Sequence, residues 1–297
     1  MFYTLRQLQH LVAVADAGRI SAAAKTLHIS QPALSASLLQ LESACGSALF
    51  VRHKARGVSL TDSGRKLVVE ARKLVNHALE LENYARHLGD GMDGEMAVGC
   101  FTTLAPLWLP RLLSALRLTY PALSINVQEG DVRELQDAIL DGRIETALSY
   151  DIDIPEALDA VPLARMQTYA LLHSGHELAK RKRISLKQLR EDPMVLLDLP
   201  HSRDYFRSVF SAAGIEPRVV YRTSSFEMVR CMVANGHGYS VLNQRIAMSK
   251  VYDGGEVAMV PLTDNLPELN VVLLTLSATP LTRRGQTFVD FCRDFYA

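Results

Sequence analysis

The first apolar stripe of the chain has the period of an α-helix and stops at a glycine. Its members lie three or four positions apart, as one face of a helix requires, and Gly18 is a residue type that commonly ends helices. We expect this helix to form the floor on which the next segment rests. The stripe consists of Leu5, Leu8, Leu11, Val12 and Ala15.

The pattern after Gly18 predicts two short helices joined by a tight turn. Ser21 is placed to cap the first, and the alanines at 22–24 favour a helix with little bulk. The residues at 28–30 interrupt this helix. Ser30 can then cap a second helix whose first turn contains Pro32, where a missing N–H does no harm.

The second of these helices is amphipathic. Its core stripe is Leu34, Leu38 and Leu41, which leaves Gln31, Ser35 and Ser37 outward. Two helices joined in this way, with short polar side chains at the exposed start of the second, have the form of a helix-turn-helix. The alternative is an ordinary helical hairpin with no partner.

A loose alternation of apolar and polar residues from Leu49 to Leu60 predicts a two-stranded wing. Arg52, His53, Lys54 and Arg56 surround Gly57. Cations on such a wing would contact phosphates or the minor groove, where they add affinity and salt dependence but little sequence information.

From residue 67 the apolar positions alternate in steps of four and three. This is a heptad repeat, which predicts a long helix that pairs with a copy of itself, so we expect a dimer. Leucine alternates with alanine, and each small residue can receive a large one from the partner, which favours close packing. The alternative is a long helix lying on the remainder of its own chain. The seam consists of Leu67, Ala71, Leu74, Ala78, Leu81, Ala85 and Leu88.

The three glycines within residues 89–94 predict a hinge, after which short strands alternate with helices. This pattern is α/β, and we expect a mostly parallel sheet. The predicted strands are 95–100, 124–128, 146–149, 169–173, 194–198, 218–221, 238–242 and 270–276. The predicted helices are 104–118, 132–141, 202–213, 226–234 and 281–295.

Composition fits a folded protein of two or three domains. The chain has 297 residues, a length that exceeds one ordinary core. Of these residues, 48% are hydrophobic and 22% are charged. Its net charge of zero by itself argues against a nucleic-acid partner. However, residues 1–66 contain eight Lys or Arg and three Asp or Glu, so that segment carries about +5 and the remainder about −5. A basic head on an acidic body suits contact with phosphate at one end only.

The cysteines and the N-terminus point to a reducing compartment. Cys45, Cys100, Cys231 and Cys292 are widely spaced without metal-site intervals, so we expect reduced, mostly buried thiols and no metal site. The chain starts without a signal-peptide pattern, and no apolar run is long enough to span a membrane. We therefore expect a cytoplasmic protein without a membrane partner.

The N-terminal motifs resemble those of the LysR-type transcriptional regulators. These motifs are the alanine-rich helix at 22–24, Ser-Gln-Pro-Ala-Leu-Ser at 30–35, Leu41-Glu42, Leu-Phe-Val-Arg at 49–52 and Leu-Thr-Asp-Ser-Gly at 60–64. The resemblance covers the first ninety residues by motif and the rest by architecture. It implies a regulator that binds operator DNA as a homodimer arranged into a tetramer and responds to a small molecule, and it leaves RNA polymerase open as a further partner.

The resemblance also implies a division of the chain. An all-α winged helix-turn-helix domain would span 1–60, with the helix-turn-helix at 20–39, and a linker helix 61–90. A two-subdomain effector-binding domain of periplasmic-binding-protein type would span 91–297, within an α/β fold class. Its subdomain I would comprise 94–161 and 267–297, and its subdomain II 162–266.

One departure from the family bears on base recognition. The resemblance leads us to expect a long basic or amide side chain at position 36, but this is Ala36, and residues 31–44 contain no Lys or Arg. Gln31 and Ser35 are then the best candidates for base edges, with apolar contact from Pro32 or Ala33 to a thymine methyl. The full DNA-binding set is Ser21, Ser30, Gln31, Pro32, Ser35, Ser37, Arg52, Lys54 and Arg56.

Two segments place hydroxyl groups where a predicted strand gives way to a helix, one in each subdomain. Ligands of open α/β sheets bind at such points, because helix N-termini offer free N–H groups and partial positive charge. A cleft between the two segments would suit an anionic or polar organic effector, and no other cofactor is expected. Each hydroxyl taken alone is as readily a plain helix cap. The segments are residues 99–103 and 198–203, and their candidates are Thr102, Thr103, His201 and Ser202. Ser149, Thr223 and Ser224 end or follow other predicted strands and could line the same cleft.

Other motifs carry less weight. Gly236-His237-Gly238-Tyr239-Ser240 faintly resembles a nucleophile elbow, but Leu242 stands where the second glycine is needed. Lys180-Arg181-Lys182-Arg183 is typical of a solvated loop, with auxiliary DNA contact as the alternative. Trp108 and Tyr120 are more typical of a core or an interface than of a ligand cage.

Two functions compete on these observations. The first is a transcription regulator without catalytic activity that binds a small effector. The second is a cytoplasmic two-lobed α/β enzyme or ligand carrier with a helical assembly module. The head separates them, because an assembly module has no need for a basic wing after a Ser-Gln-Pro helix start.

Overall fold

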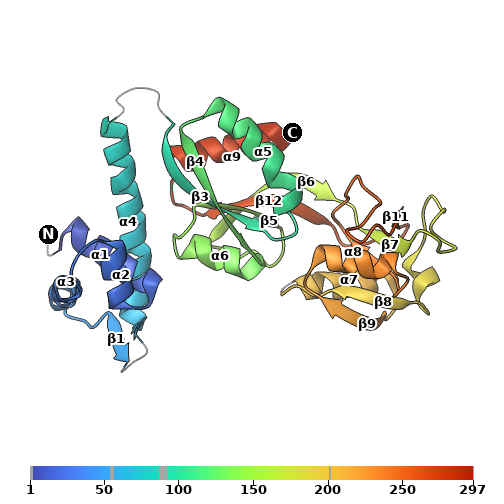
Figure 1. Cartoon of the computed structure of the whole chain (residues 1–297), viewed down its shortest axis with the longest axis horizontal. Helices are drawn as coiled ribbons and strands as arrows, with labels where there is room; N and C mark the ends of the chain where they lie inside the picture. Colours follow the sequence, from blue (N-terminus) through green and yellow to red (C-terminus); the bar gives the residue numbers. More distant parts are fainter. Residues whose placement is uncertain (1–2, 54–56, 87–91, 201, 297) are drawn as a thin grey trace.

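The computed structural model describes residues 3–53, 57–86, 92–200 and 202–296, without the side chains of residues 80, 83–86 and 202. Figure 1 shows a small helical domain at the N-terminus, a long helix beside it and two α/β lobes in a row. We call the first part the head, the long helix the linker helix, and the lobes lobe I and lobe II.

The head is a three-helix domain with a two-stranded wing. Thr4 and Gln7 form a reciprocal capping box at the start of α1, and Gly18 ends this helix with a φ of 61°. Buried leucines from α1 and α3 form the core, including the predicted Leu34, Leu38 and Leu41. The elements are α1 (Leu5–Ala17), α2 (Ile20–Thr26), α3 (Gln31–Cys45), β1 (Phe50–His53) and β2 (Gly57–Leu60), and β1 and β2 pair antiparallel.

The wing is held to the head by residues of the Leu-Glu and Leu-Thr-Asp-Ser-Gly motifs. Oε1 of Glu42 accepts hydrogen bonds from the backbone N–H groups of Leu49 and Phe50 at 2.8 and 3.1 Å. The Thr61 hydroxyl donates to the carbonyl of Ala48 at 2.7 Å. A Cβ at Gly64 would clash with the Leu49 carbonyl oxygen, so only glycine fits there.

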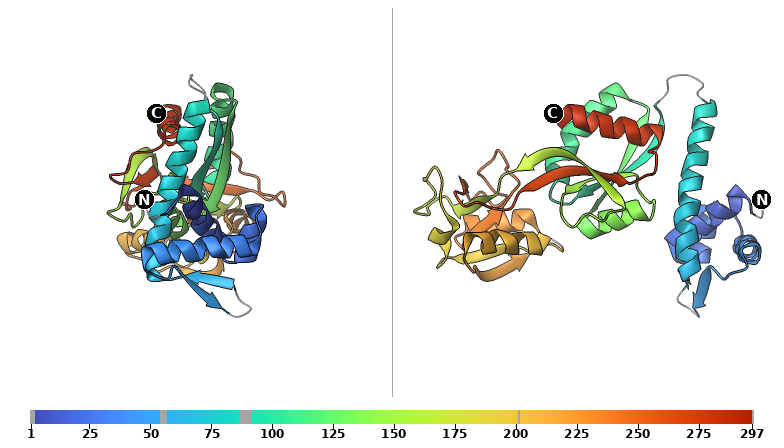
Figure 2. Two further views of the ribbon diagram at one scale, coloured as in Figure 1. Left: turned by 90° about the vertical axis from the view of Figure 1, so that its left-hand side faces the viewer. Right: turned by 180° about the vertical axis from the view of Figure 1, so that it is seen from behind.

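The linker helix α4 (Asp62–Arg86) runs along α1 and then beside lobe I, as Figures 1 and 2 show. Val68, Ala71 and Val75 are buried in the core of the head. Leu79 and Asn76 line a cavity of about 160 Å³ together with residues of lobe I, including Glu95 and Arg143. The linker helix therefore has one face on the head and another toward lobe I.

Lobe I is built on a five-stranded sheet in the order β4-β3-β5-β12-β6. Strand β3 is parallel to β4 and β5, whereas β12 is antiparallel to β5 and β6. Helices α5 and α9 lie on one side of the sheet and α6 on the other (Figure 1). The elements are β3 (Gly94–Phe101), α5 (Ala105–Thr119), β4 (Leu123–Gly130), α6 (Val132–Leu140), β5 (Thr146–Tyr150), β6 (Leu158–Met166), β12 (Leu269–Leu276) and α9 (Arg283–Tyr296).

Lobe II combines a three-stranded antiparallel sheet, β10-β7-β11, with the parallel pair β8-β9. A bridge between Met194 and Tyr239 joins the two sheets. The elements are β7 (Tyr169–His173), the 3₁₀ helix η1 (Leu186–Leu189), β8 (Pro193–Leu197), α7 (Ser202–Ala213), β9 (Arg218–Thr223), α8 (Phe226–Ala234), β10 (Ser240–Leu242) and β11 (Val257–Pro261).

The strands β6 and β12 carry the chain between the lobes, as the right-hand view of Figure 2 shows. The expected α/β class is present, and each predicted strand and helix of this region overlaps an observed one. The expectation of a mostly parallel sheet is wrong, because both lobes contain antiparallel pairs. The sequence also missed β6, which contains Pro162. Proline is tolerated in this strand because β6 lies at the sheet edge.

Candidate nucleic-acid interface and effector site

The start of α3, the start of α2 and the wing meet around one groove. This groove has a volume of about 440 Å³, and three elements that are far apart in sequence contribute to it. Among the residues that the structure describes, Arg19 and Arg52 have no ion-pair partner and are exposed, so the groove has two cations free to meet an anion. The lining residues are Arg19, Ile20, Ser21, Gln31, Ser35, Arg52, Gly57 and Val58.

The first turn of α3 presents short side chains to this groove. Ser30 caps the helix by accepting a hydrogen bond from the Ala33 N–H at 3.3 Å, as its sequence position predicted. The Ser30 hydroxyl is therefore engaged by the backbone, whereas Gln31 and Pro32 are exposed and Ser35 is partly exposed. The position of Ser21 was wrong as a cap, because α2 begins at Ile20 with Arg19 as its N-cap residue.

Ser37 is partly exposed, but its hydroxyl already has a partner within the head. Its hydroxyl lies 2.7 Å from Nδ1 of His10, and His10 is only 8% exposed. Burial, with a smaller contribution from the charge of Arg6, lowers the pKa of His10. Ser37 thus joins α3 to α1 through its hydroxyl, and its contact with DNA stays a prediction.

The wing offers Arg52 as an exposed cation on β1. Beside it, Nε2 of His53 pairs with the Ser59 hydroxyl at 2.7 Å across the two strands, which fixes the wing's register. The predicted contacts Lys54 and Arg56 lie outside the described residues.

The structure divides the predicted seam of the linker helix into two parts. Ala71 is buried against the head and Leu67 packs on the same core, so these two are used within the protomer. This corrects the N-terminal end of the seam: Val68, Ala71 and Val75 turn that face of the helix toward α1. Farther along, Leu74 is 48% exposed and Leu81 67% exposed, with Ala78 partly exposed between them. The side chain of Ala85 is not described, and Leu88 lies outside the described residues.

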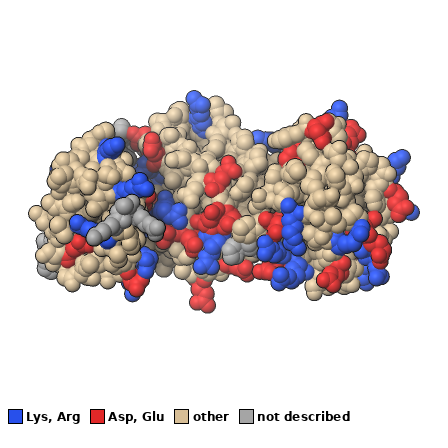
Figure 3. Space-filling model, turned by 60° about the horizontal axis from the view of Figure 1, so that its bottom comes forward, with Lys and Arg blue, Asp and Glu red and all other residues tan. Residues whose placement is uncertain are grey.

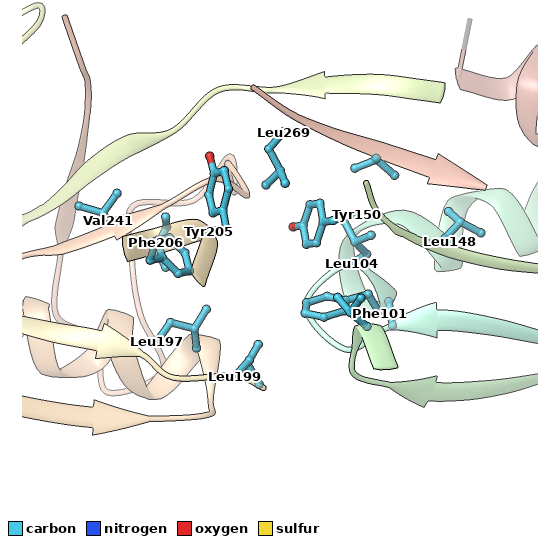
Figure 4. Close-up of a cluster of buried hydrophobic side chains, with 14 of the residues drawn as sticks. Phe101, Leu104, Leu148, Tyr150, Leu197, Leu199, Tyr205, Phe206, Val241 and Leu269 are labelled. Atoms are coloured by element: carbon cyan, nitrogen blue, oxygen red, sulfur yellow. The ribbon is translucent and has the colours of Figure 1, made fainter. Parts of the chain in front are cut away.

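The carboxyl ends of β3 in lobe I and β8 in lobe II face one another across the junction of the lobes. Figure 4 shows Phe101 and Tyr150 on one side, and Leu199 and Tyr205 on the other. All four side chains are buried, and they belong to one apolar cluster that continues through both lobes. The two strand ends that the sequence singled out are therefore brought together, but their walls are aromatic and apolar.

In lobe I the predicted hydroxyls have different surroundings. Thr103 is buried close to the Tyr150 hydroxyl, so it lies at the lobe junction. Thr102 is exposed and donates to the Gly130 carbonyl at 3.2 Å. Ser149 is fully buried, and its hydroxyl has no hydrogen-bond partner among the described residues. Neither threonine caps α5, which begins at Ala105 without a side-chain cap.

In lobe II the segment after β8 is organised by Asp198. Its carboxylate accepts a hydrogen bond from Arg203 at 2.8 Å and lies 3.5 Å from Arg222. His201 lies outside the described residues, and the side chain of Ser202 is not described.

The hydroxyls after β9 act as turn and cap groups. The Thr223 hydroxyl accepts from the N–H of Ser225, and Ser225 caps α8 by accepting from Met228 at 3.3 Å. Ser224 between them is exposed.

A buried polar chain that sequence reasoning missed crosses between the lobes. Gln244, just after β10, accepts a hydrogen bond from the indole N–H of Trp108 at 3.3 Å and donates to the Tyr150 hydroxyl at 2.6 Å. Tyr150 in turn donates to Asn243 at 3.3 Å. No local motif marks Gln244, because its partners lie about a hundred residues away.

Charge on the lobes is mixed. On the face drawn in Figure 3, Lys and Arg alternate with Asp and Glu over both lobes. The basic run at 180–183 is exposed, as expected for a solvated loop, and Arg183 hydrogen-bonds the Leu262 carbonyl. Within the described parts of the chain, no group of three or more His, Cys, Asp or Glu could hold a metal ion. None of the described helices is long and apolar enough to cross a membrane.

Comparison with known families matches the chain in two parts. A model described as the bacterial regulatory helix-turn-helix protein, lysR family, matches residues 5–65. A model described as the LysR substrate binding domain matches residues 89–297.

Full-length relatives agree with this division. The hydrogen peroxide-inducible genes activator of Dickeya chrysanthemi is 28% identical over 292 residues, which cover 98% of this chain and 95% of that protein. The crystal structure of HinK, a LysR family transcriptional regulator from Pseudomonas aeruginosa, is 35% identical with a TM-score of 0.67 and covers 99% of both chains. A full-length OxyR variant from Pseudomonas aeruginosa is 26% identical with a TM-score of 0.79, covering 98% of this chain and 97% of that one.

Proposed function

The chain belongs to the LysR family of transcriptional regulators, which bind operator DNA as oligomers and respond to small molecules, and from this premise we propose how its own residues carry out both tasks. The head reads the operator through the groove between α3 and the wing. The linker helix joins two copies, and the junction of the lobes binds the effector. The observation that carries the DNA-binding part is that Ser21, Gln31, Ser35 and Arg52 converge on one groove.

Within this groove the roles divide by chemistry. An amide such as Gln31 can make a bidentate contact to adenine, and the Ser35 hydroxyl can pair with any base edge. The exposed ring of Pro32 offers an apolar surface to a thymine methyl. Arg19 and Arg52 flank these residues and would contact phosphates, which positions the helix and adds salt-dependent affinity.

The sparse charge of α3 makes pairing of heads essential. Residues 31–44 contain no Lys or Arg, so a single head has little electrostatic attraction beyond its wing and the start of α2. Two heads held at a fixed separation bind two half-sites at once, and the second contact becomes intramolecular. We propose that Leu74, Ala78 and Leu81 form the seam that holds them, in dimers that assemble into a tetramer.

The junction of the lobes suits a small organic effector with an apolar body and a polar or anionic group. Phe101, Tyr150, Tyr205 and Leu199 would contact the body. The Thr103 hydroxyl and the N-terminus of α7, whose first backbone N–H groups have no partner within the helix, would meet the polar group. The remaining candidates Ser202 and His201 adjoin that helix start in sequence.

Effector binding would act through the angle between the lobes. An effector shifts an equilibrium only through its different affinity for the two arrangements, and a coupling of about 1 to 3 kcal/mol is ordinary. Because lobe I lies beside the linker helix, a change in lobe angle would alter the spacing of the heads.

The cysteines do not support a peroxide response of the kind named for some relatives. A cysteine reacts with peroxide as a thiolate. Burial raises the pKa of Cys292 to about 12 and that of Cys100 further still, so both remain protonated thiols. Cys45 lies in the head and Cys231 in lobe II, so these two cysteines are too far apart to form a disulfide within one protomer. We therefore propose a reversibly bound effector rather than an oxidant.

The proposal excludes catalysis as the main function and places the protein where bacterial DNA is, in the cytoplasm. The competing hypothesis, a two-lobed enzyme or carrier with a helical assembly module, leaves the free cations of the groove without a role. No membrane partner is proposed.

A gel shift with the chain's own upstream region tests the proposal directly. The wild-type protein should prefer this fragment over random DNA of the same length at two salt concentrations. A double variant, Gln31→Ala with Ser35→Ala, should lose the preference while keeping weak, salt-dependent binding to both fragments. Equal binding of wild-type protein to both fragments at every salt concentration would refute the assignment.

A further inference from the structure

The polar chain at the lobe junction has a single consistent hydrogen-bond direction. An indole N–H can only donate, so the oxygen of the Gln244 amide must face Trp108, and its NH₂ group must face Tyr150. The Tyr150 oxygen accepts that bond, and its own proton is then free to reach Asn243. Burial raises the pKa of Tyr150 to about 12, which keeps this proton in place at physiological pH.

These bonds join lobe II to lobe I and reach two helices of lobe I. Gln244 and Asn243 extend from β10 in lobe II, whereas Tyr150 and Trp108 belong to lobe I. The backbone carbonyl of Gln244 also accepts a hydrogen bond from the Tyr169 hydroxyl at 2.6 Å, which fixes the segment after β10 within lobe II. On the other side, the Trp108 carbonyl accepts from Tyr296 at 2.7 Å, so the chain of contacts reaches α5 and α9.

The same tyrosine belongs to the wall that faces lobe II. The ring of Tyr150 packs edge-on against Phe101 with their centroids 5.1 Å apart, and Figure 4 shows both directed toward Leu199 and Tyr205. A molecule at the junction of the lobes would therefore displace or trap the ring whose hydroxyl is bonded to Gln244.

We propose that Gln244 is a positioning residue that fixes the angle between the lobes and passes a displacement of Tyr150 to Trp108 and α5. The inference rests on the proposed effector response and adds the residues that transmit it. Gln244 is 2% exposed, and a buried amide is costly unless it is paired, so its bonds favour one arrangement of the lobes over all others. Hydrogen bonds weaken steeply with misalignment, so a small rotation of lobe II suffices to break the chain.

The full-length chain provides its own probe, because Trp108 is its only tryptophan. Gln244→Met keeps the side chain's length and removes both polar atoms. Gln136→Met is the matched control: Gln136 is 3% exposed and its amide donates to the carbonyls of Ile152 and Asp153, both within lobe I. Each variant loses two side-chain hydrogen bonds, but only the first loses bonds between the lobes.

Two measurements without DNA test the positioning role. We expect Gln244→Met to raise the acrylamide quenching constant of Trp108 by about twofold or more, as a shift toward open lobes exposes the indole. The radius of gyration from small-angle scattering should rise with it. Tyr150→Phe, which keeps the ring, should change both readouts in the same direction. A Gln244→Met protein that only melts earlier, with the quenching and scattering of the Gln136→Met control, would overturn the proposal.

A third measurement tests transmission to the head. Operator affinity of Gln244→Met should differ from that of wild type by roughly 5-fold or more, within the ordinary range of coupling, while Gln136→Met stays near wild type. Open lobes with unchanged operator affinity would refute the transmitting role. Failure of the proposed function is distinguishable, because wild-type protein would then show no operator preference, whatever the quenching of Trp108.

Discussion

The guanidinium of Arg72 on the linker helix holds both carboxylate oxygens of Asp16 at the end of α1, with N···O distances of 2.9 and 2.6 Å. The Arg72 side chain is 12% exposed and that of Asp16 49%. This two-point contact fixes the rotation of the head about the linker helix, where Val68 and Ala71 supply only non-directional apolar packing. This ion pair thus adds a directional contact to the apolar packing that orients the head on the linker helix.

The ion pair predicts an unequal effect of removing its two partners. Asp16→Ala leaves a mostly buried guanidinium unpaired and should destabilise the head by about 1 kcal/mol or somewhat more. Arg72→Met keeps an apolar stem and leaves only a half-exposed, solvated carboxylate, so it should cost less. Calorimetric unfolding of the two variants measures the difference, and a larger loss for Arg72→Met would contradict this account.

Gln31 should control sequence preference. The side chain is exposed at the first position of α3 and has no partner of its own among the described hydrogen bonds. Gln31→Ala should lose about 1 to 3 kcal/mol of discrimination at one base pair of each half-site. Binding to random DNA should hardly change. Competition with operators mutated one base pair at a time locates the contact, and a uniform loss across all sequences would mean that Gln31 only positions the helix.

Arg52 should behave in the opposite way. As an exposed cation on β1 it would contact a phosphate, so Arg52→Ala should weaken binding to every sequence alike. The slope of log affinity against log salt should fall by about 1 for each phosphate that the variant no longer neutralises. Titrations at four or more salt concentrations give this slope, and an unchanged slope would remove Arg52 from the interface.

The head was predictable because its sequence motifs act locally. Leu41-Glu42 and Leu-Thr-Asp-Ser-Gly determine structure within about twenty residues: Glu42 binds the backbone at Leu49 and Phe50, Thr61 binds Ala48, and Gly64 makes room for a carbonyl. Helix caps such as Ser30 follow the same logic. Where the partner of a side chain comes from another helix, no local pattern predicts the contact: nothing near Ser37 in the sequence indicates that its hydroxyl would pair with His10.

The lobe junction was predictable only in outline. That strand ends in α/β sheets meet ligands is a general rule, and it correctly brought the ends of β3 and β8 together. The rule does not predict side-chain chemistry at that point, because aromatic residues such as Phe101 and Tyr205 fit a plain core equally well. The Trp108–Gln244–Tyr150 chain depends on how two lobes are placed, which no local pattern encodes.

His10 gives the head a defined pH dependence. Its folded-state pKa is lowered, so the unfolded chain binds the proton more readily, and stability is fully present above the ordinary pKa of about 6.5. Stability should then fall as the pH drops from 6.5 through the folded-state value. His10→Gln can still hydrogen-bond Ser37 but does not titrate. From pH 7.5 to pH 5.5, the melting temperature of wild type should therefore fall more than that of the variant. An equal fall in both proteins would exclude His10 as the cause.

The exposed leucines of the linker helix yield the sharpest prediction about assembly. Leu74 and Leu81 are 48% and 67% exposed in the protomer, whereas the helix face at Val68 and Val75 is already covered by the head. Burying a leucine contributes roughly 1.5 to 3 kcal/mol, and a dimer buries each seam leucine twice. Leu74→Asp and Leu81→Asp should therefore separate the two linker helices and abolish tight operator binding, because a single head whose residues 31–44 contain no Lys or Arg does not hold the operator tightly on its own.

Leu79→Asp is the matched control for these variants. Leu79 is 45% exposed on the same helix, but it lies off the seam and lines the cavity toward lobe I. Sedimentation should show an assembly smaller than that of wild type for the two seam variants and the wild-type assembly for Leu79→Asp. If all three keep the wild-type assembly, the seam is not the interface. If Leu79→Asp also dissociates, the exposed apolar surface of the helix as a whole forms the interface, rather than the alternating leucines and alanines.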